Sequence, residues 1–200
     1  WHIFKSITYW SDHACAIRTD NKAMCWGWNF VGELWDGTTT DKSIPTLVNW
    51  GYDFREISVW FGSVCGGRRD NKVMCWGWNS GGKLWDGTTT DKSLPTLVSW
   101  GYDFKHISVW QWHTCWVRLD NQAMCWGMND YGYLWDGTSW AATFKKVPTI
   151  VLWGYNFTEV SAWFSTTCWV RTDNKAMCWW GNWYGQIWDG TTTNKSIPTL

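Results

Sequence analysis

Apolar and polar residues alternate over short stretches that are separated by turn residues, a pattern that predicts strands. The stretch "FREISVW" (54–60) alternates as a half-buried strand does. The stretches "VCGGRR" (64–69) and "KVMCWGW" (72–78) flank "DN", where Asn71 can adopt a left-handed turn conformation. "WDGTTTDKSLP" (85–95) predicts a loop and "TLVSW" (96–100) a fourth strand, whereas no stretch shows a convincing helical period.

This pattern occurs four times along the chain. Similar segments begin at Met24, Met74, Met124 and Met177, and the last step is longer because "SWAATFKKVP" (139–148) has three residues more than its counterparts. Four short strands per unit of roughly 50 residues predict an all-β fold, a β-propeller built of four-stranded antiparallel blades. A parallel β-helix is the alternative. The units, which form a single repeat array over 1–200 with no linker or second domain, are 1–50, 51–100, 101–153 and 154–200.

Versions of three motifs recur in order in each unit and carry a family resemblance. They are "HTC" (113–115), "RTDNKAMCWG" (18–27) and "DGTTTDKSIP" (36–45). With them the chain resembles the regulator-of-chromosome-condensation repeat family, in its bacterial form, over its whole length. The resemblance implies a propeller, commonly seven-bladed. Four units therefore indicate a fragment of a larger propeller or an unusual four-bladed ring, and a fragment would leave two open edges.

Tryptophan stands where the family has glycine. Aligned positions 27, 77, 127 and 180 read Gly, Gly, Gly and Trp, although these two residues are among the least interchangeable. The alignment places seventeen of the 24 tryptophans at glycine-like positions, namely 1, 10, 35, 50, 60, 85, 100, 110, 112, 116, 135, 153, 163, 169, 180, 183 and 188. The tryptophans that match a family tryptophan are Trp26, Trp76, Trp126 and Trp179.

A decoding error would explain this substitution. Overpacking costs about 1–3 kcal/mol per site, and seventeen such sites exceed the roughly 5–15 kcal/mol that stabilise a domain. Our hypothesis is that UGA codons, which some bacterial lineages read as glycine, have been translated as tryptophan. Trp28 and Trp78 are ambiguous, and Trp140 lies in the longer loop. Genuine tryptophan enrichment is the alternative, and it leaves the exchange of glycine for tryptophan unexplained.

Charge and hydropathy restrict the class of partner. The chain carries 17 acidic and 17 basic residues and no basic block, so we expect no nucleic-acid partner. Its apolar runs are shorter than the roughly 18 residues of a membrane span. Nothing resembles a signal peptide and there is no initiator Met, so we expect an excerpt or a processed product.

The cysteines form four pairs with identical spacing: Cys15 with Cys25, Cys65 with Cys75, Cys115 with Cys125, and Cys168 with Cys178. Each pair spans the hairpin between the second and third strands of a unit. A three-residue turn at 19–21 would place the two cysteines opposite each other, close enough for a disulfide, whereas a two-residue turn would not. Four disulfides would favour an extracellular or cell-surface location, and buried free thiols are the alternative.

The other recurring polar residues indicate structural roles. His113 aligns with His13, Ser63 and Thr166, all of which can hydrogen-bond, so we expect bonds between blades. The aspartates of the "DGT" motifs predict turn caps, with calcium at Asp36 and Asp41 a less favoured reading and zinc disfavoured by the lack of a C-x-x-C motif. These aspartates are Asp36, Asp86, Asp136 and Asp189. No nucleophile, base and acid are combined, so we expect neither an enzyme nor a cofactor.

The resemblance implies a protein-interaction platform whose specificity lies in variable loops. The candidate binding residues for a still unknown protein partner are Phe30, Val31, Glu33, Ser80, Lys83, Asp130, Tyr131, Tyr133, Trp140, Phe144, Tyr184 and Gln186. Nucleotide exchange on a small GTPase is an alternative, although no wedge-like insertion is present. Stacking on carbohydrate is another. An ultraviolet sensor is disfavoured, because the column that would hold its tryptophans reads Ser11, Phe61, Gln111 and Phe164.

Overall fold

The computed structural model of the chain describes residues 2–98, 102–110, 113–129, 132–138, 144–151, 154–163 and 166–199. In this part of the chain no helix is long and apolar enough to cross a membrane. The strands of the first two blades are β1 (Phe4–Trp10), β2 (His13–Arg18), β3 (Ala23–Gly27), β4 (Lys42–Leu47), β5 (Phe54–Trp60), β6 (Ser63–Arg68), β7 (Val73–Gly77) and β8 (Lys92–Leu97). Those of the last two are β9 (Phe104–Val109), β10 (His113–Arg118), β11 (Ala123–Met128), β12 (Phe144–Ile150), β13 (Phe157–Trp163), β14 (Thr166–Arg171), β15 (Ala176–Trp180) and β16 (Lys195–Thr199).

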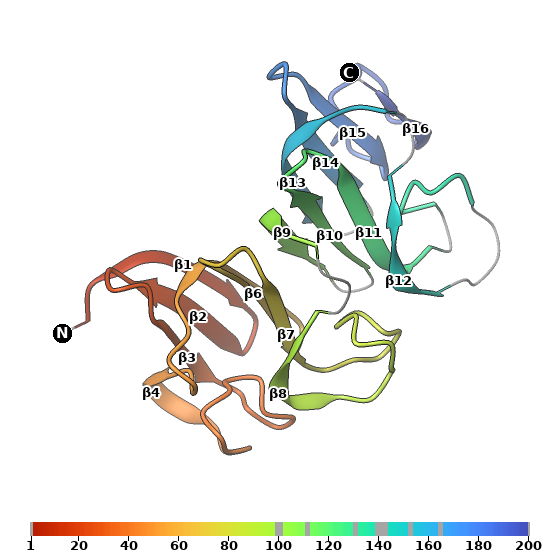
Figure 1. The fold of residues 1–200 in the computed structure, drawn as a ribbon. Helices are drawn as coiled ribbons and strands as arrows, with labels where there is room; N and C mark the ends of the chain where they lie inside the picture. Colours follow the sequence, from red (N-terminus) through yellow and green to blue (C-terminus); the bar gives the residue numbers. More distant parts are fainter. Residues whose placement is uncertain are drawn as a thin grey trace.

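The strands form four antiparallel sheets, each with its four strands in chain order. We call these sheets blades one to four. The first strands of consecutive blades, β1, β5, β9 and β13, contact one another, so they line the inside of the array. Blades one and four lie at opposite ends of an arc (Figure 1). The predicted all-β, four-stranded repeat is therefore confirmed.

Blade two tests the strand boundaries that the sequence pattern predicted. β5 covers 54–60 as expected, and the hairpin of β6 and β7 turns at Asn71, whose φ is 65°. The fourth strand was predicted wrongly at 96–100, because β8 begins at Lys92, which pairs with Gly77. β8 is the outer edge of its sheet, where proline and polar residues are tolerated, so its first half resembles a loop in sequence.

The predicted disulfides follow from the hairpin between the second and third strands. The backbone N–H of Arg18 donates to the carbonyl of Lys22 at 2.8 Å, which leaves the three-residue turn 19–21 between β2 and β3. This register places Cys15 directly opposite Cys25, with their Cα atoms 4.1 Å apart and their sulfurs bonded. A two-residue turn, which would have separated the two cysteines, is therefore not used.

The same bridge is present in the other three blades. Its partners there are Cys65 and Cys75 in blade two, Cys115 and Cys125 in blade three, and Cys168 and Cys178 in blade four. Cys115 lies directly opposite Cys125 in the pairing of β10 with β11, with their Cα atoms 4.2 Å apart. All eight cysteines are paired, so the alternative of free thiols does not apply. The four bridges indicate an oxidising environment.

The core lies between blades rather than within one. Ile17 and Leu34 of blade one pack against Phe54, Val64 and Trp76 of blade two in one buried cluster. Equivalent clusters join blades two and three, and blades three and four. Each blade is therefore stabilised by burying one sheet face against its neighbour.

Six tryptophans at glycine-like positions have a backbone that favours glycine. They are Trp35, Trp50, Trp85, Trp135, Trp180 and Trp188, with φ between 49° and 80°. Trp180 has φ 80°, and the aligned Gly27 and Gly77 have φ 105° and 90°. A Cβ atom at Gly27 would lie 2.2 Å from the carbonyl oxygen of Asp12. Both the left-handed backbone and the close approach explain why this column otherwise holds glycine.

Tryptophans at glycine-like positions are also crowded. The ring centroids of Trp10 and Trp60 are 3.1 Å apart, and those of Phe104 and Trp116 are 3.4 Å apart. Aromatic pairs prefer centroid separations of about 4.5–7 Å. In blade two the residue aligned with Trp116 is Gly66, where an added Cβ would lie 2.6 Å from the Phe54 ring. The space at this column accommodates a glycine, and an indole overfills it.

Tryptophans in the family's tryptophan column and tryptophans at glycine-like positions differ in the hydrogen bonding of their indole N–H groups. Trp76 and Trp126 occupy the family's tryptophan column, and their Nε1 atoms donate to the carbonyls of Glu33 and Lys83 in the preceding blade, at 2.7 and 2.8 Å. In the described part of the chain, five buried indoles at glycine-like positions have no hydrogen-bond partner, namely Trp35, Trp60, Trp85, Trp116 and Trp169. Trp179, although it belongs to the family column, shares this lack. Each unsatisfied buried donor costs about 1–3 kcal/mol.

Candidate functional site

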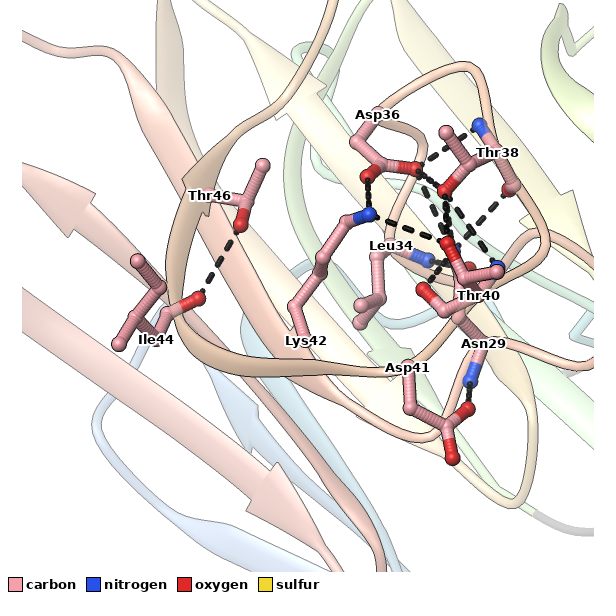
Figure 2. A network of polar contacts seen from close by, with 9 residues as sticks. All are labelled: Asn29, Leu34, Asp36, Thr38, Thr40, Asp41, Lys42, Ile44 and Thr46. Atoms are coloured by element: carbon pink, nitrogen blue, oxygen red, sulfur yellow. Dashed lines mark hydrogen bonds and ion pairs between the residues drawn. The ribbon is translucent and has the colours of Figure 1, made fainter.

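The loop that follows the third strand shapes one rim of each blade, and a buried asparagine organises it. In blade one the side-chain amide of Asn29 donates to the carbonyls of Thr38 and Thr40, both at 3.0 Å (Figure 2). Its Oδ1 accepts from the backbone N–H of Leu34 at 2.9 Å. Asn79, Asn129 and Asn182 make the corresponding Oδ1 bond in their own blades. Sequence reasoning missed this residue, although its recurrence in all four units was a usable signal.

The predicted aspartate turn cap is present in the same loop. The Asp36 carboxylate accepts from the backbone N–H of Thr38 at 2.9 Å and from its hydroxyl at 2.7 Å. Its other oxygen lies 3.0 Å from the Lys42 ammonium (Figure 2). Burial raises the pKa of Asp36, but the bonds from Thr38 and Lys42 outweigh it, so the pKa lies below its ordinary value.

These contacts argue against a calcium site at Asp36 and Asp41. Lys42 neutralises the Asp36 carboxylate, and the Asp41 carboxylate accepts from the backbone N–H of Asn29 at 2.9 Å. Within the described ranges, no three His, Cys, Asp or Glu side chains gather where they could hold a metal ion. The loop is therefore held by its own hydrogen bonds and one ion pair.

On this rim a cavity of about 480 Å³ opens between blades one and two. Its walls are aromatic and come from Trp28 and Phe30 of blade one and from Phe61 and Trp78 of blade two. The rings of Phe61 and Trp78 stack with their centroids 5.2 Å apart. Phe30 is 74% exposed at the mouth. A concave, mainly aromatic site of this size can bury an apolar side chain of a partner.

Two buried titratable groups line the inner part of this pocket. Burial raises the pKa of Glu33, whose Oε2 accepts from the backbone N–H of Val31 at 3.0 Å. Burial lowers the pKa of His13 to about 4, so its imidazole is neutral at pH 7. Among the described residues its Nε2 has no hydrogen-bond partner.

Comparison of His13 with the aligned residues of the other blades explains why its Nε2 atom has no hydrogen-bond partner. In blade three, Nε2 of the aligned His113 lies 3.0 Å from the hydroxyl of Thr167 in blade four, as the prediction of bonds between blades requires. The residue of blade two that aligns with Thr167 is Val64, which has no hydroxyl. The prediction is wrong for Ser63 and Thr166, whose hydroxyls donate to carbonyls of their own blades at 2.6 and 2.8 Å.

Exchanging valine and threonine at this column should shift stability in opposite directions. Val64→Thr is expected to supply a partner for His13 and to stabilise the protein by about 1 kcal/mol. Thr167→Val is expected to leave His113 unsatisfied and to cost about 1–3 kcal/mol. Urea unfolding followed by circular dichroism measures both changes. Equal effects of the two substitutions would contradict this account of the histidines.

Some of the predicted binding residues are exposed, and others are buried. Exposed residues are Phe30, Ser80, Phe144, Tyr184 and Gln186, and Val31 is half-buried. Glu33, Lys83 and Tyr133 are buried at one aligned position, so they do not form an exposed loop surface as predicted. Their column faces the next blade, to which the carbonyls of Glu33 and Lys83 are bonded. Asp130, Tyr131 and Trp140 lie outside the described residues.

The cavity therefore brings together only part of the predicted surface. Phe30, Val31 and Glu33 line it, whereas Tyr184 and Gln186 belong to blade four. Sequence reasoning also missed the contribution of Phe61 and Trp78 from the neighbouring blade. The signal for them was their place beside the first and third strands of their unit, at the same rim.

Comparison with known proteins identifies the repeat and the fold. Residues 8–33, which form β1, β2, β3 and the start of the rim loop, match the family model of the Regulator of chromosome condensation (RCC1) repeat. This segment is therefore similar to an RCC1 repeat. A search of curated protein sequences found no match.

Solved structures extend the likeness to the whole chain. Human WBSCR16 superposes with a TM-score of 0.84 at 15% identity, covering 98% of this chain and 52% of that one. Yeast RCC1 (Prp20), in a structure with Kap60, gives 0.80 at 16% identity, covering 99% and 48%. Prp20p from Saccharomyces cerevisiae gives 0.79 at 15% identity, covering 99% and 50%. The chain thus has the RCC1 propeller fold over about half the length of these structures, and the predicted propeller is confirmed.

Proposed function

We propose that this chain is a non-enzymatic protein-binding module of the RCC1 propeller type, and that it binds its partner at the aromatic pocket between blades one and two. The observation that carries the proposal is the cavity of about 480 Å³ with Phe30 and Trp28 exposed at its mouth. Exposed aromatic residues around a concave site are common anchors of protein interfaces. The disulfides support a location outside the cell.

The chemistry of the pocket favours a peptide segment with an apolar anchor and a basic neighbour. The aromatic walls would bury the apolar side chain. Asp12 and Asp91 line the same cavity, and their negative charge would attract a cation. Glu33, the buried acid of this pocket, already accepts a hydrogen bond from the backbone N–H of Val31. We therefore assign Glu33 to holding the loop in place rather than to proton transfer.

A random peptide library displayed on phage, selected against the immobilised chain, tests this function. We expect selected peptides to lose at least about tenfold in affinity, or ~1.4 kcal/mol, when Phe30→Ser opens the mouth of the pocket. Phe30 is exposed, so this change should leave the fold intact. The matched control is Asp20→Ser in the turn at the opposite end of β3, which should bind the peptides unchanged. Peptides that bind the Phe30 variant normally would refute the proposed site.

Carbohydrate stacking is a second candidate, because the rings of Phe61 and Trp78 stack on each other and these residues are 45% and 41% exposed. Like the aromatic walls of the peptide site, it depends on Trp78 being a true tryptophan. Binding of oligosaccharides to the chain, lost in Trp78→Gly and kept in Phe30→Ser, would favour this function over peptide binding.

We also propose that all four units are RCC1 repeats and that the natural protein carries glycine at the seventeen glycine-like positions. The left-handed backbone of Trp180, the crowded ring of Trp116 and the unsatisfied indole of Trp85 support the second proposal. The coding DNA tests it, since UGG codons at these positions would refute the decoding hypothesis.

A further inference from the structure

The aromatic pocket between blades one and two has walls that attract positive charge. Its rings belong to Trp28, Phe30, Phe61 and Trp78. The face of an aromatic ring carries partial negative charge and attracts a cation within about 6 Å of its centroid. The Lys83 ammonium lies 5.7 Å from the Trp78 centroid, so one of these rings already has a cation at that distance. None of the four residues is at a glycine-like position, although the walls are complete only if Trp28 and Trp78 are true tryptophans.

The acidic residues of this pocket are held by hydrogen bonds rather than neutralised by ion pairs. The Asp12 carboxylate accepts from the Ser11 hydroxyl at 2.8 Å, and the Asp91 carboxylate accepts from the backbone N–H of Asn79 at 2.7 Å. Most other aspartates in the described part of the chain lie within 3.1 Å of a lysine or arginine. No such ion pair joins Asp12, Glu33 or Asp91 to a described residue, so their charges are available to a ligand.

The electrostatic effect of these charges is seen at Glu33. Burial raises the pKa of Glu33, backbone hydrogen bonds oppose that rise, and the negative charges of Asp41 and Asp91 raise the pKa further. Burial lowers the pKa of Lys83 to about 8 against the opposing effect of Asp91, so this lysine is charged at pH 7. Lys83 therefore offsets only part of the negative charge around the pocket, and a cation brought by a ligand would be attracted.

Gly62 brings an acid and an aromatic ring together in the pocket. A Cβ atom added at Gly62 would lie 3.4 Å from Oε1 of Glu33 and 3.5 Å from ring atom Cε3 of Trp78. Both distances are ordinary van der Waals contacts, so the carboxylate oxygen and the indole approach the same small space. The pocket therefore combines a group that attracts positive charge with a ring that packs against methyl groups.

We propose that the aromatic pocket binds a trimethylated lysine of the protein partner, with the quaternary ammonium held among the rings. The inference rests on the proposed function, because it names the side chain that would anchor the bound peptide. A quaternary ammonium has methyl groups, a full positive charge and no N–H, so it suits aromatic walls better than the strongly hydrated ammonium of lysine. The choline head group of a lipid also has a quaternary ammonium, but Asp12 and Asp91 would repel its adjacent phosphate.

Three short alanine–glycine peptides that differ in one side chain test this proposal by titration calorimetry on the intact chain. The side chain is trimethyllysine, unmodified lysine, or a neutral analogue in which carbon replaces the quaternary nitrogen. We expect the trimethyllysine peptide to bind at least about tenfold more tightly than either of the others, and its advantage over the neutral peptide to shrink at high salt. Equal affinity for the trimethyllysine and neutral peptides would overturn the proposal.

Two pocket variants test whether the rings and the acids cause this preference. Phe61→Leu removes a ring but keeps an apolar side chain, and Asp91→Asn removes a charge but keeps an oxygen that can accept from Asn79. Each should reduce the preference for trimethyllysine over the neutral analogue several-fold. Asp20→Asn, which removes a charge in the turn at the opposite end of β3, is the matched control and should leave it unchanged. Circular dichroism establishes that each variant is folded, and an unchanged preference in both pocket variants would overturn the proposal.

The results also separate this proposal from the proposed function. If the peptides selected on phage depend on Phe30 but the trimethyllysine peptide binds no better than its neutral analogue, the proposed function stands and this inference is wrong. If neither set of peptides binds, the site itself is refuted. Cosedimentation of the chain with phosphatidylcholine vesicles, without binding of the trimethyllysine peptide, would assign the pocket to a lipid and overturn the proposal.

Discussion

Replacing Trp180 with glycine is expected to stabilise the protein by about 1–3 kcal/mol, the cost of a non-glycine residue held in the left-handed region. The residue has φ 80°, and its column in blades one and two has no room for a Cβ atom. Trp180 is only partly buried, so its removal leaves little cavity. Urea unfolding measures the change as a higher midpoint at an unchanged slope.

The adjacent tryptophan provides the matched control. Trp179 is buried between blades three and four and belongs to the column where the family has tryptophan. Trp179→Gly is expected to destabilise the protein by about 3–5 kcal/mol, because it removes a large buried ring. Two neighbouring tryptophans should thus respond to the same substitution with opposite signs. A loss of stability in both would contradict the assignment of position 180 to glycine.

Reduction of the four disulfides is expected to unfold the chain. A bridge that closes a loop of this size contributes about 2–3 kcal/mol, so the four together approach the whole stability of a domain. Thermal unfolding with and without a phosphine reductant measures the effect. A thiol-labelling reagent establishes that all four disulfides have been reduced. An unchanged thermal unfolding transition in such a fully reduced sample would contradict the prediction.

Burial predicts the order in which the bridges are reduced. Cys168 and Cys178 of blade four are half-buried, whereas Cys65 and Cys75 are fully buried between blades. Limited reduction followed by alkylation and mass spectrometry should label the first pair before the second. Double serine variants of each pair provide the matched comparison, and the variant of blade two should lose more stability because both of its cysteines are fully buried in the core.

Repetition made the fold predictable from one sequence. A period of about 50 residues and alternating polarity identified the strands, whereas the sequence left the length of the turn between the second and third strands open. The structure has three-residue turns at 19–21 and 119–121, and these place Cys15 opposite Cys25 and Cys115 opposite Cys125. The fourth strand was misplaced because an edge strand such as β8 tolerates the polar residues and proline that also mark a loop.

The site was harder to predict, because it is formed between units rather than within one. Variation at the column of Glu33, Lys83 and Tyr133 suggested an exposed surface, yet these side chains are buried at the contacts between blades. Phe61 and Trp78 reach the pocket from the neighbouring unit, a proximity that the order of residues in one repeat does not reveal.

We propose that an RCC1-type propeller underlies this sequence and that seventeen of its glycine positions have been read as tryptophan. Tandem mass spectrometry of the protein from its natural source, over the peptide that contains residues 178–191, tests it most directly. We predict tryptophan at position 179 and glycine at positions 180, 183 and 188. Tryptophan at all four positions would contradict the claim.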